Sequence, residues 1–183
     1  MPKMAANLTM LFTDVPFLER FPAAKQAGFK YVEFLFPYEH PAEKVKEVLE
    51  KNGLQVINFN LPCGNWAGGD RGIGASPNRV EEFRAGVKTA VSYATVLGTP
   101  RLNCLAGKMV AGFSREDHKK TLVENLRFAA DALKEIGVNL IVEHINPYDI
   151  PGFFLNRVQE VLEVIAEVNR PKLYVQYDIY HAS

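Results

Sequence analysis

The stretch GVNLIVE, residues 137–143, carries the pattern that decides the fold: a glycine, a short apolar run and a carboxylate at its end. Glycine is common just past a helix end, where the chain turns with a positive φ. The run that follows is short, apolar and β-branched, as expected of a buried strand. A helix is therefore expected to end before Gly137 and a strand to end near Glu143.

The same arrangement recurs along the chain. Gly28 precedes YVEF, Gly53 precedes QVINF, Gly98 precedes RLNCL, and Pro171 marks the last break, before KLYVQYD. Between these marks apolar residues recur at helical spacing, within 17–24, 45–49, 83–94, 122–133 and 158–165. Ser76 before Pro77, and Ser114 with Asp117, indicate helix N-termini. Five helices are therefore expected to alternate with six strands.

This alternation predicts an α/β protein with a parallel sheet, because parallel strands need a crossover long enough to hold a helix. Spread over six units, 183 residues give about 30 each, close to one unit of an eight-unit barrel. We expect one incomplete (β/α)₈ TIM-barrel domain over residues 1–183, with about six βα units. The rival is a doubly wound open sheet, but ANLTMLFTDVP stands where its GxGxxG fingerprint would follow the first strand.

Polar residues at the strand ends also favour the barrel. Asn60, Asn103, Glu143 and Asp178 lie at or near the C-terminal ends of expected strands, and Glu33 lies in the second strand. In a barrel these ends converge on one mouth, where barrel enzymes carry out their chemistry.

Composition limits the class of protein. Lysine plus arginine equals aspartate plus glutamate, at 21 each, so no overall positive charge attracts nucleic acid or an anionic membrane. The N-terminus lacks signal-peptide features, and no apolar run approaches the length of a membrane span. Cys63 and Cys104 are far apart and outside any CxxC pattern, which favours two reduced thiols. We expect a cytoplasmic protein with neither a nucleic-acid nor a membrane partner.

The longest irregular stretch is PCGNWAGGDRGIGASP, residues 62–77. It ends without the Gly-Lys-Ser/Thr of a phosphate loop. A mobile lid over the mouth and a surface excursion without function are the two interpretations. Within this stretch, Trp66 either covers the substrate or anchors the loop.

Two carboxylates at strand ends indicate metal chemistry. An ionised Glu143 after a buried strand is costly unless it is paired, hydrogen-bonded or bound to a metal. Asp178 ends the next strand, and His181 three residues later can face the same mouth. Two such carboxylates form half of an oxygen-rich site for Mg²⁺ or Mn²⁺. A salt bridge at Glu143 and a helix cap at Asp178 are the structural alternatives, and the other histidines are expected to be structural.

Seven longer stretches, spread over the whole chain, carry a resemblance beyond these patterns. They are ANLTMLF, GFKYVEFLFPYE, LPCGNWAGGDRGI, NCLAGK, TLVENLRFAAD, EHINPYDIPGFFL and QYDIYH. On these stretches the chain resembles the hydroxypyruvate isomerase family of the xylose-isomerase-like TIM-barrel superfamily.

The resemblance implies roles for three residues. Glu143 would be a ligand of a divalent metal ion, Mg²⁺, Mn²⁺ or Co²⁺, and one of two glutamates that move protons. Asp178 would be a second ligand, and His181 would hold a substrate oxygen. His144 stands where the family usually has proline. The other two ligands, one of them the second glutamate, would come from two further strands expected beyond Ser183.

The implied reaction interconverts hydroxypyruvate and 2-hydroxy-3-oxopropanoate (tartronate semialdehyde) through an enediolate. The substrate carboxylate needs a cation, and Arg71 in the glycine-rich loop and Lys108 after the fourth strand are the candidates, against a solvated surface charge.

Several alternatives stay open. The substrate of such an isomerase could instead be a 2-oxo-tetronate or a ketose, the latter in a 3-epimerase. A truncated, inactive barrel would act only through binding or by forming a homo-oligomer at its exposed strand edges. Oligomerisation could also supply the missing ligands. A DNA-repair endonuclease shares the superfamily barrel, but the neutral net charge counts against it.

Overall fold

Six parallel strands pair in simple sequential order in the computed structural model, which describes residues 3–182. The strands are β1 (Ala5–Asn7), β2 (Tyr31–Glu33), β3 (Gln55–Asn60), β4 (Arg101–Cys104), β5 (Asn139–Glu143) and β6 (Leu173–Gln176). The helices are α1 (Arg20–Gln26), α2 (Ala42–Asn52), α3 (Val80–Leu97), α4 (Arg115–Glu135) and α5 (Val158–Val168). The predicted α/β class and incomplete barrel are confirmed. The doubly wound alternative is wrong, because its strand order would reverse within the sheet.

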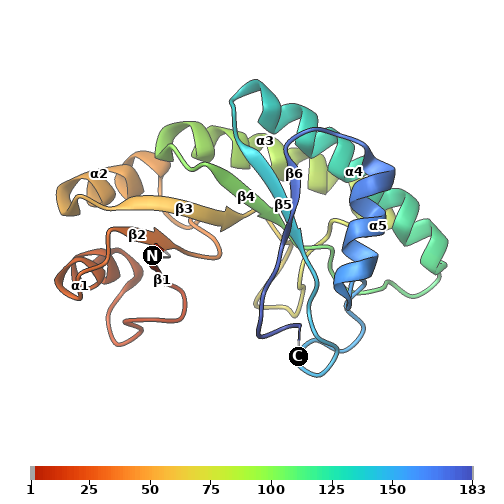
Figure 1. Cartoon of the computed structure of the whole chain (residues 1–183), viewed down its shortest axis with the longest axis horizontal. Coiled ribbons are helices and arrows are strands. Elements are labelled where there is room, and N and C mark those ends of the chain that lie inside the picture. The colour runs from red at the N-terminus through yellow and green to blue at the C-terminus, as the bar shows by residue number, and fades with distance from the viewer. Residues whose placement is uncertain (1–2, 183) are drawn as a thin grey trace.

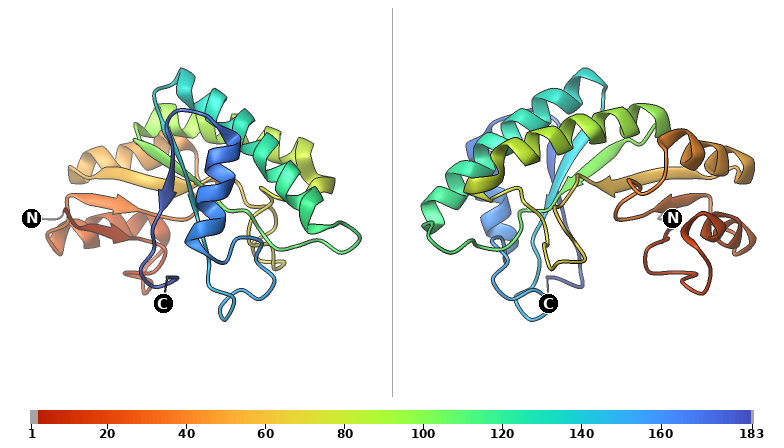
Figure 2. Two further views of the ribbon diagram at one scale, coloured as in Figure 1. Left: turned by 45° about the vertical axis from the view of Figure 1, so that its right-hand side comes forward. Right: turned by 180° about the vertical axis from the view of Figure 1, so that it is seen from behind.

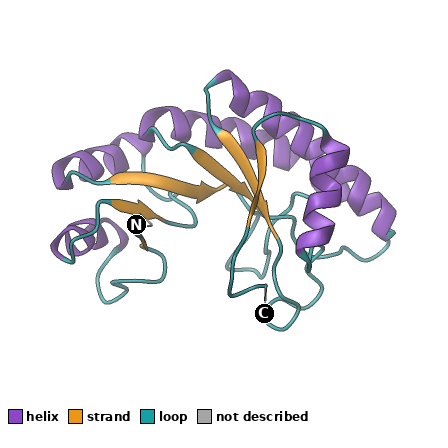
Figure 3. Cartoon of the chain, in the orientation of Figure 1, coloured by secondary structure: helices purple, strands orange, loops and turns teal. Residues whose placement is uncertain are grey.

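The sheet curls as a barrel wall does. The helices lie along the outer, convex side of the arc, and many of the loops gather at one end of it (Figures 1 and 2). Colouring by secondary structure shows the same two layers, helices outside and strands inside (Figure 3). Asn58 of β3 donates from Nδ2 to Oε1 of Gln176 in β6 at 3.4 Å, although β4 and β5 lie between those strands. Side chains of non-neighbouring strands therefore meet across the concave face.

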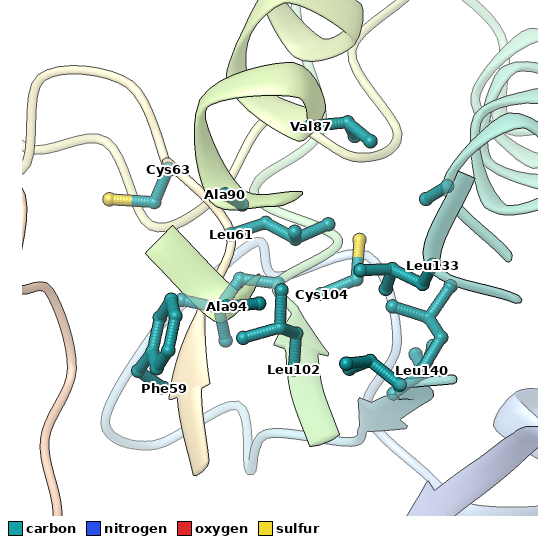
Figure 4. Close-up of a cluster of buried hydrophobic side chains, with 14 of the residues drawn as sticks. Phe59, Leu61, Cys63, Val87, Ala90, Ala94, Leu102, Cys104, Leu133 and Leu140 are labelled. Carbon is teal, nitrogen blue, oxygen red and sulfur yellow. The ribbon is translucent and has the colours of Figure 1, made fainter. Parts of the chain in front are cut away.

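The apolar core fills the layer between sheet and helices. Phe59, Leu102 and Leu140 point from β3, β4 and β5 into this layer, where Ala90 and Ala94 of α3 lie over the strands (Figure 4). Small residues on α3 let the helix approach the sheet closely. Burying a large apolar side chain contributes roughly 1.5–3 kcal/mol, so this layer dominates the stability of the fold.

The helix ends follow the local sequence signals in most cases. Ser114 and Asp117 form a capping box, with Ser114 Oγ accepting from the Asp117 backbone N–H at 3.1 Å. Gly53 and Gly98 end α2 and α3 with φ of 60° and 68°. Ser76 differs from expectation, because its side chain makes no capping bond and the three-residue 3₁₀ helix Pro77–Arg79 precedes α3.

Within residues 3–182, every helix is too short or too polar to cross a bilayer.

Candidate active site

A cavity of about 450 Å³ opens at the C-terminal ends of the strands. Its polar lining includes Asn7, Glu33, Asn58, Asn60, Glu143, Gln176, Asp178 and His181, joined by Trp66 and Arg71 from the glycine-rich loop. Asn103 lies behind this lining, in contact with Glu143. The strand-end residues singled out in the sequence therefore come together. A larger cavity of about 760 Å³ includes strand starts such as Gln55 and Arg101 in its lining, at the end of the strands where barrel enzymes do not place their chemistry.

Glu143, the last residue of β5, is the central group of the site. Its side chain is held at both oxygens: Oε1 accepts from Asn103 Nδ2 and Oε2 accepts from Gln176 Nε2, each at 2.7 Å. Burial raises the pKa of Glu143 to about 7, and the charges of Asp178 and Glu33 raise it too, while the two hydrogen bonds oppose the shift. Glu143 forms no ion pair with any residue in the range 3–182, which argues against the salt-bridge alternative.

Asp178 lies two residues beyond β6 and keeps its carboxylate partly open to the cavity. Oδ1 accepts from the Tyr180 backbone N–H at 2.9 Å, and Oδ2 lies 4.0 Å from His181 Nε2. The aspartate thus holds a turn, and no helix follows it up to residue 182. Its second oxygen faces the imidazole and remains available for a ligand.

Asn146 determines which tautomer a neutral His181 ring adopts. The Asn146 Oδ1 accepts from the backbone N–H groups of Tyr148 and Asp149, at 3.0 and 2.9 Å, so the amide orientation is settled by its partners. Asn146 Nδ2 must then donate to His181 Nδ1, 2.9 Å away. A neutral His181 therefore carries its proton on Nε2, the nitrogen on the Asp178 side.

Arg71 and Trp66 form a stacked pair at the wall of the cavity. The Arg71 guanidinium lies 4.3 Å from the Trp66 ring centroid, and Arg71 Nη1 donates to the carbonyls of Trp66 and Asp70 at 3.1 and 2.6 Å. Trp66 in turn packs on Phe36, with ring centroids 5.2 Å apart. The tryptophan thus anchors the loop while its side chain also lines the cavity.

Lys108 does not line the cavity that contains Glu143. It is exposed and lines an adjoining cavity of about 300 Å³ together with Arg71 and Arg79, so that Arg71 alone of these lines both cavities. Gly107, with φ of 88°, turns the chain there, and the backbone of Lys108 forms an isolated antiparallel β-bridge with that of Phe153. The lysine therefore belongs to the outer side of the glycine-rich loop.

The other histidines differ in their surroundings. His118 is fully buried; its Nε2 accepts from the Val110 backbone N–H, and its Nδ1 lies near the Ser114 carbonyl, both at 2.8 Å. His40 stacks on Phe17 with ring centroids 5.6 Å apart. His144 is buried, and neither ring nitrogen has a hydrogen-bond partner in the described part of the chain.

Three amide residues of the site were not singled out in the sequence. Gln176 contacts Glu143 directly, Asn58 holds Gln176, and Asn7 donates from Nδ2 to Glu33 Oε1 at 3.1 Å. One signal was present in QVINFN, where Asn58 and Asn60 alternate with a buried phenylalanine, and another in QYD, where Gln176 precedes Asp178 by two. Residues two apart share a face of a strand.

The donor chemistry of the cavity suits part of a divalent-metal site. Glu33, Glu143 and Asp178 influence one another electrostatically, and burial together with these like charges raises the pKa values of Glu33 and Glu143. A cation would relieve this repulsion, and carboxylates are the ligands that Mg²⁺ and Mn²⁺ prefer. Residues 3–182 contain no group of three or more His, Cys, Asp and Glu placed to hold a metal ion. The carboxylates are therefore of the type that binds such an ion, and the described residues alone do not make a complete ligand set.

Comparison with known proteins agrees with this geometry. The chain is 50% identical to hydroxypyruvate isomerase of Escherichia coli K12 over 181 residues, covering 99% of the chain and 70% of that relative. It is 43% identical to 2-oxo-tetronate isomerase of Haemophilus influenzae, again over 70% of the relative. A crystal structure described as AP endonuclease, family 2, from Brucella melitensis superposes with a TM-score of 0.96 at 42% identity, covering the whole chain and 70% of that protein.

The family of xylose isomerase-like TIM barrels matches residues 21–183, nearly the whole chain. The sequential parallel strands, the carboxylates at their C-terminal ends and relatives that are isomerases agree with this match. The chain therefore belongs to the xylose isomerase-like TIM barrel family, as an isomerase-type member of it.

Proposed function

We propose that this protein interconverts hydroxypyruvate and 2-hydroxy-3-oxopropanoate by moving a proton between adjacent carbons through an enediolate. The observation that carries the proposal is Glu143, a buried carboxylate with a pKa of about 7 that lines a cavity with Asp178 and Arg71. The identity of 50% to hydroxypyruvate isomerase supports this choice of substrate.

Glu143 acts as the base in this proposal. A general base works best when its pKa lies near the operating pH, because it then accepts and returns a proton with similar ease. A pKa of about 7 meets that condition. Glu143 removes the proton from the carbon next to the carbonyl, and the second glutamate that the family resemblance implies returns a proton to the neighbouring carbon.

A divalent ion, Mg²⁺, Mn²⁺ or Co²⁺, is the cofactor we propose, held by Glu143 and Asp178 with further ligands from outside residues 3–182. When bound, such an ion polarises the carbonyl and stabilises negative charge on the enediolate oxygens. The unneutralised carboxylates of the cavity support this assignment.

Two other residues orient the substrate. Arg71 is the cation that lines the same cavity as Glu143, so we assign it the substrate carboxylate. His181 donates from Nε2 to a substrate oxygen, as the hydrogen bond of its Nδ1 with Asn146 supports. Lys108 lies in the adjoining cavity and is left outside this assignment.

A four-carbon 2-oxo-tetronate is the second candidate substrate. Relatives that act on 2-oxo-tetronates are 42–44% identical to the chain. The reaction would use the same base and the same cation, and a cavity of about 450 Å³ has room for one more hydroxymethine group.

Glu143→Gln tests the proposal. Loss of a general base lowers the rate by about 10²- to 10⁴-fold, so the variant should be nearly inactive with Mg²⁺, Mn²⁺ or Co²⁺ present. Turnover of hydroxypyruvate and a 2-oxo-tetronate is measured on this chain and on a form extended to the length of its relatives. Glu135→Gln, an exposed position at the end of α4, is the matched control and should keep full activity. Unchanged turnover in Glu143→Gln would remove the proposed base.

We also propose the cytoplasm as the compartment of the protein. Cys63 and Cys104 are both free and buried, and burial raises their pKa values to about 11 and about 12. Such thiols stay protonated and unreactive at neutral pH, which suits a reducing compartment.

A further inference from the structure

Four amide side chains from three strands surround Glu143 in two tiers. Asn103 and Gln176 donate to its two oxygens at 2.7 Å, a length typical of hydrogen bonds to a charged group. Asn103 Nδ2 also donates to Asn60 Oδ1 at 3.1 Å, and Gln176 Oε1 accepts from Asn58 Nδ2 at 3.4 Å. We call Asn58, Asn60, Asn103 and Gln176 the amide cradle.

The amide cradle fixes the carboxylate in direction. A glutamate held at one oxygen can still rotate about its last bond, whereas one held at both oxygens from opposite sides cannot. Asn103 approaches from β4 and Gln176 from β6, the two strands that flank β5. The braces from β3 keep both donors from turning away.

The amide cradle leaves some buried polar atoms unpaired, which lowers the stability of the fold. Asn58 Oδ1, Asn60 Nδ2 and Asn103 Oδ1 are buried without a hydrogen-bond partner in the described part of the chain. Each buried unsatisfied polar atom costs about 1–3 kcal/mol, which offsets part of the stabilisation from the hydrogen bonds that the cradle makes. Stability alone therefore does not explain why amides occupy these positions.

Neutral amides also suit the chemistry of the site better than cations. An arginine or lysine beside Glu143 would neutralise its charge and favour the ionised form strongly. Amide donors give the carboxylate a direction and leave its charge free for a proton or a metal ion.

Resting on the proposed function, we propose that Asn103 and Gln176, braced by Asn60 and Asn58, are positioning residues that hold the Glu143 carboxylate in one orientation for proton transfer. None of the four needs to touch the substrate. Their contribution is to the rate constant of the chemical step, acting through Glu143.

Four variants separate positioning from support of the fold. Asn103→Leu and Gln176→Met remove the donors at nearly constant volume, and Asn58→Leu removes one brace. Asn52→Leu is the matched control, because Asn52 is the last residue of α2, outside the cavity, and its Nδ2 also makes a hydrogen bond, to the Val48 carbonyl at 2.8 Å. For each variant kcat, KM and melting temperature are measured together, on the extended form if this chain shows no turnover.

We expect Asn103→Leu and Gln176→Met to lower kcat by about 10- to 100-fold, the range seen when residues that orient a ligating side chain are lost. KM should change little, and the melting temperature should fall, because one buried oxygen of Glu143 then lacks its donor. The kcat is therefore expressed per folded protein. Asn52→Leu should lower the melting temperature and leave kcat unchanged. Cradle variants that lose kcat only in proportion to lost folded protein would overturn the proposal.

A second measurement keeps this inference separate from the proposed function. Hydrogen exchange of the side-chain amide protons, followed by NMR, should be slow for Asn103 and Gln176, and Asn58→Leu should speed exchange at Gln176 while Asn103 stays slow. If no form turns over either substrate, the proposed function fails and exchange alone decides. Exchange at Asn103 and Gln176 as fast as at the exposed Gln159 would then remove the cradle.

Discussion

At the scale of single residues, the site depends on side chains that make several directional contacts at once. Asn146 uses its oxygen on two backbone N–H groups and its nitrogen on Asp149 and His181. One amide thereby ties the loop after β5 to the turn after β6. A substitution there would release two functional segments together.

Arg71→Lys is expected to raise KM for hydroxypyruvate by about 10- to 100-fold with a small change in kcat, because a charge-assisted hydrogen bond is worth about 1.5–3 kcal/mol. Lysine keeps the charge but loses the planar fork that binds a carboxylate and stacks on Trp66. Steady-state kinetics measures the change. Dihydroxyacetone, a neutral hydroxyketone, serves as the control substrate. An equal change in KM for both compounds would contradict the assignment of Arg71 to the carboxylate.

The charged residues of the site could be predicted from the sequence, whereas some of its neutral amides could not. Glu143 and Asp178 stood out because a carboxylate after an apolar strand demands an explanation. Gln176 and Asn58 carry no charge, and amides occur in strands for many reasons. Their importance depends on which strands meet across the curled sheet, and the spacing of residues along the chain does not contain that information.

At the scale of elements, ion pairs and close backbone contacts shape the glycine-rich loop. Gly72 and Gly107, with φ of 113° and 88°, lie against each other, and a Cβ on Gly107 would overlap the Gly72 carbonyl. The loop also forms a bridge from Gly72 to Ala106. These contacts hold Arg71 between the two cavities.

The pair of Asp70 and Arg79 predicts a pH dependence for this loop. Burial alone would raise the pKa of Asp70, but hydrogen bonds from Arg79 and the Asn65 backbone N–H, with Oδ2 distances of 2.7 and 2.6 Å, lower it. The stabilisation is therefore full above the unfolded-state pKa of about 3.9 and is lost as the pH falls through the lower folded value. Asp70→Asn should cost up to about 1 kcal/mol at pH 7.

Melting temperatures of the wild type and Asp70→Asn, measured from pH 7 down to pH 3, check this expectation. The gap between the two proteins should shrink below about pH 4, where aspartate begins to protonate in the unfolded chain. A gap that stays constant across this range would show that the ion pair does not stabilise the loop.

Backbone geometry explains the placement of Lys108. The sequence puts this lysine four residues past β4, in the loop at the C-terminal end of that strand. Gly107 then turns the chain, and the Phe154 backbone N–H donates to the Gly107 carbonyl at 2.8 Å. A contact with a segment 47 residues away (154 − 107) thus decides which cavity the side chain lines.

At the scale of the whole molecule, β1 and β6 each pair with one strand within residues 3–182 and are the two edges of the described sheet. Tyr174 of β6 is 53% exposed at one of these edges. Free edges promote pairing between copies, and a lysine there discourages it.

Tyr174→Lys is therefore expected to shift this chain from self-associated species towards monomer, as measured by sedimentation velocity. Tyr148→Lys, in the exposed loop after β5 at 86% exposure, is the control for added charge away from the edge. If both variants act alike, or if the wild type is already monomeric, edge pairing is not the mode of association.

The alternation of helices and strands was predictable from local signals, because a glycine such as Gly53 or Gly98 ends a helix and an apolar run follows it. The barrel was favoured over an open sheet by the polar strand ends and the missing fingerprint, but the contacts that curl the sheet were not predictable. One of them is the contact of Asn58 with Gln176, which spans 118 residues.

That contact also links the surroundings of Glu143 to the docking of β6. When β5 has paired with β4 but β6 has not docked, Oε2 of Glu143 still faces water. The carboxylate gains its full burial, and with it a neutral-range pKa, only when β6 docks and brings Gln176 to Asn58. A chain in which β6 has not docked would therefore keep most of its helices and strands while Glu143 lacks one of its two donors.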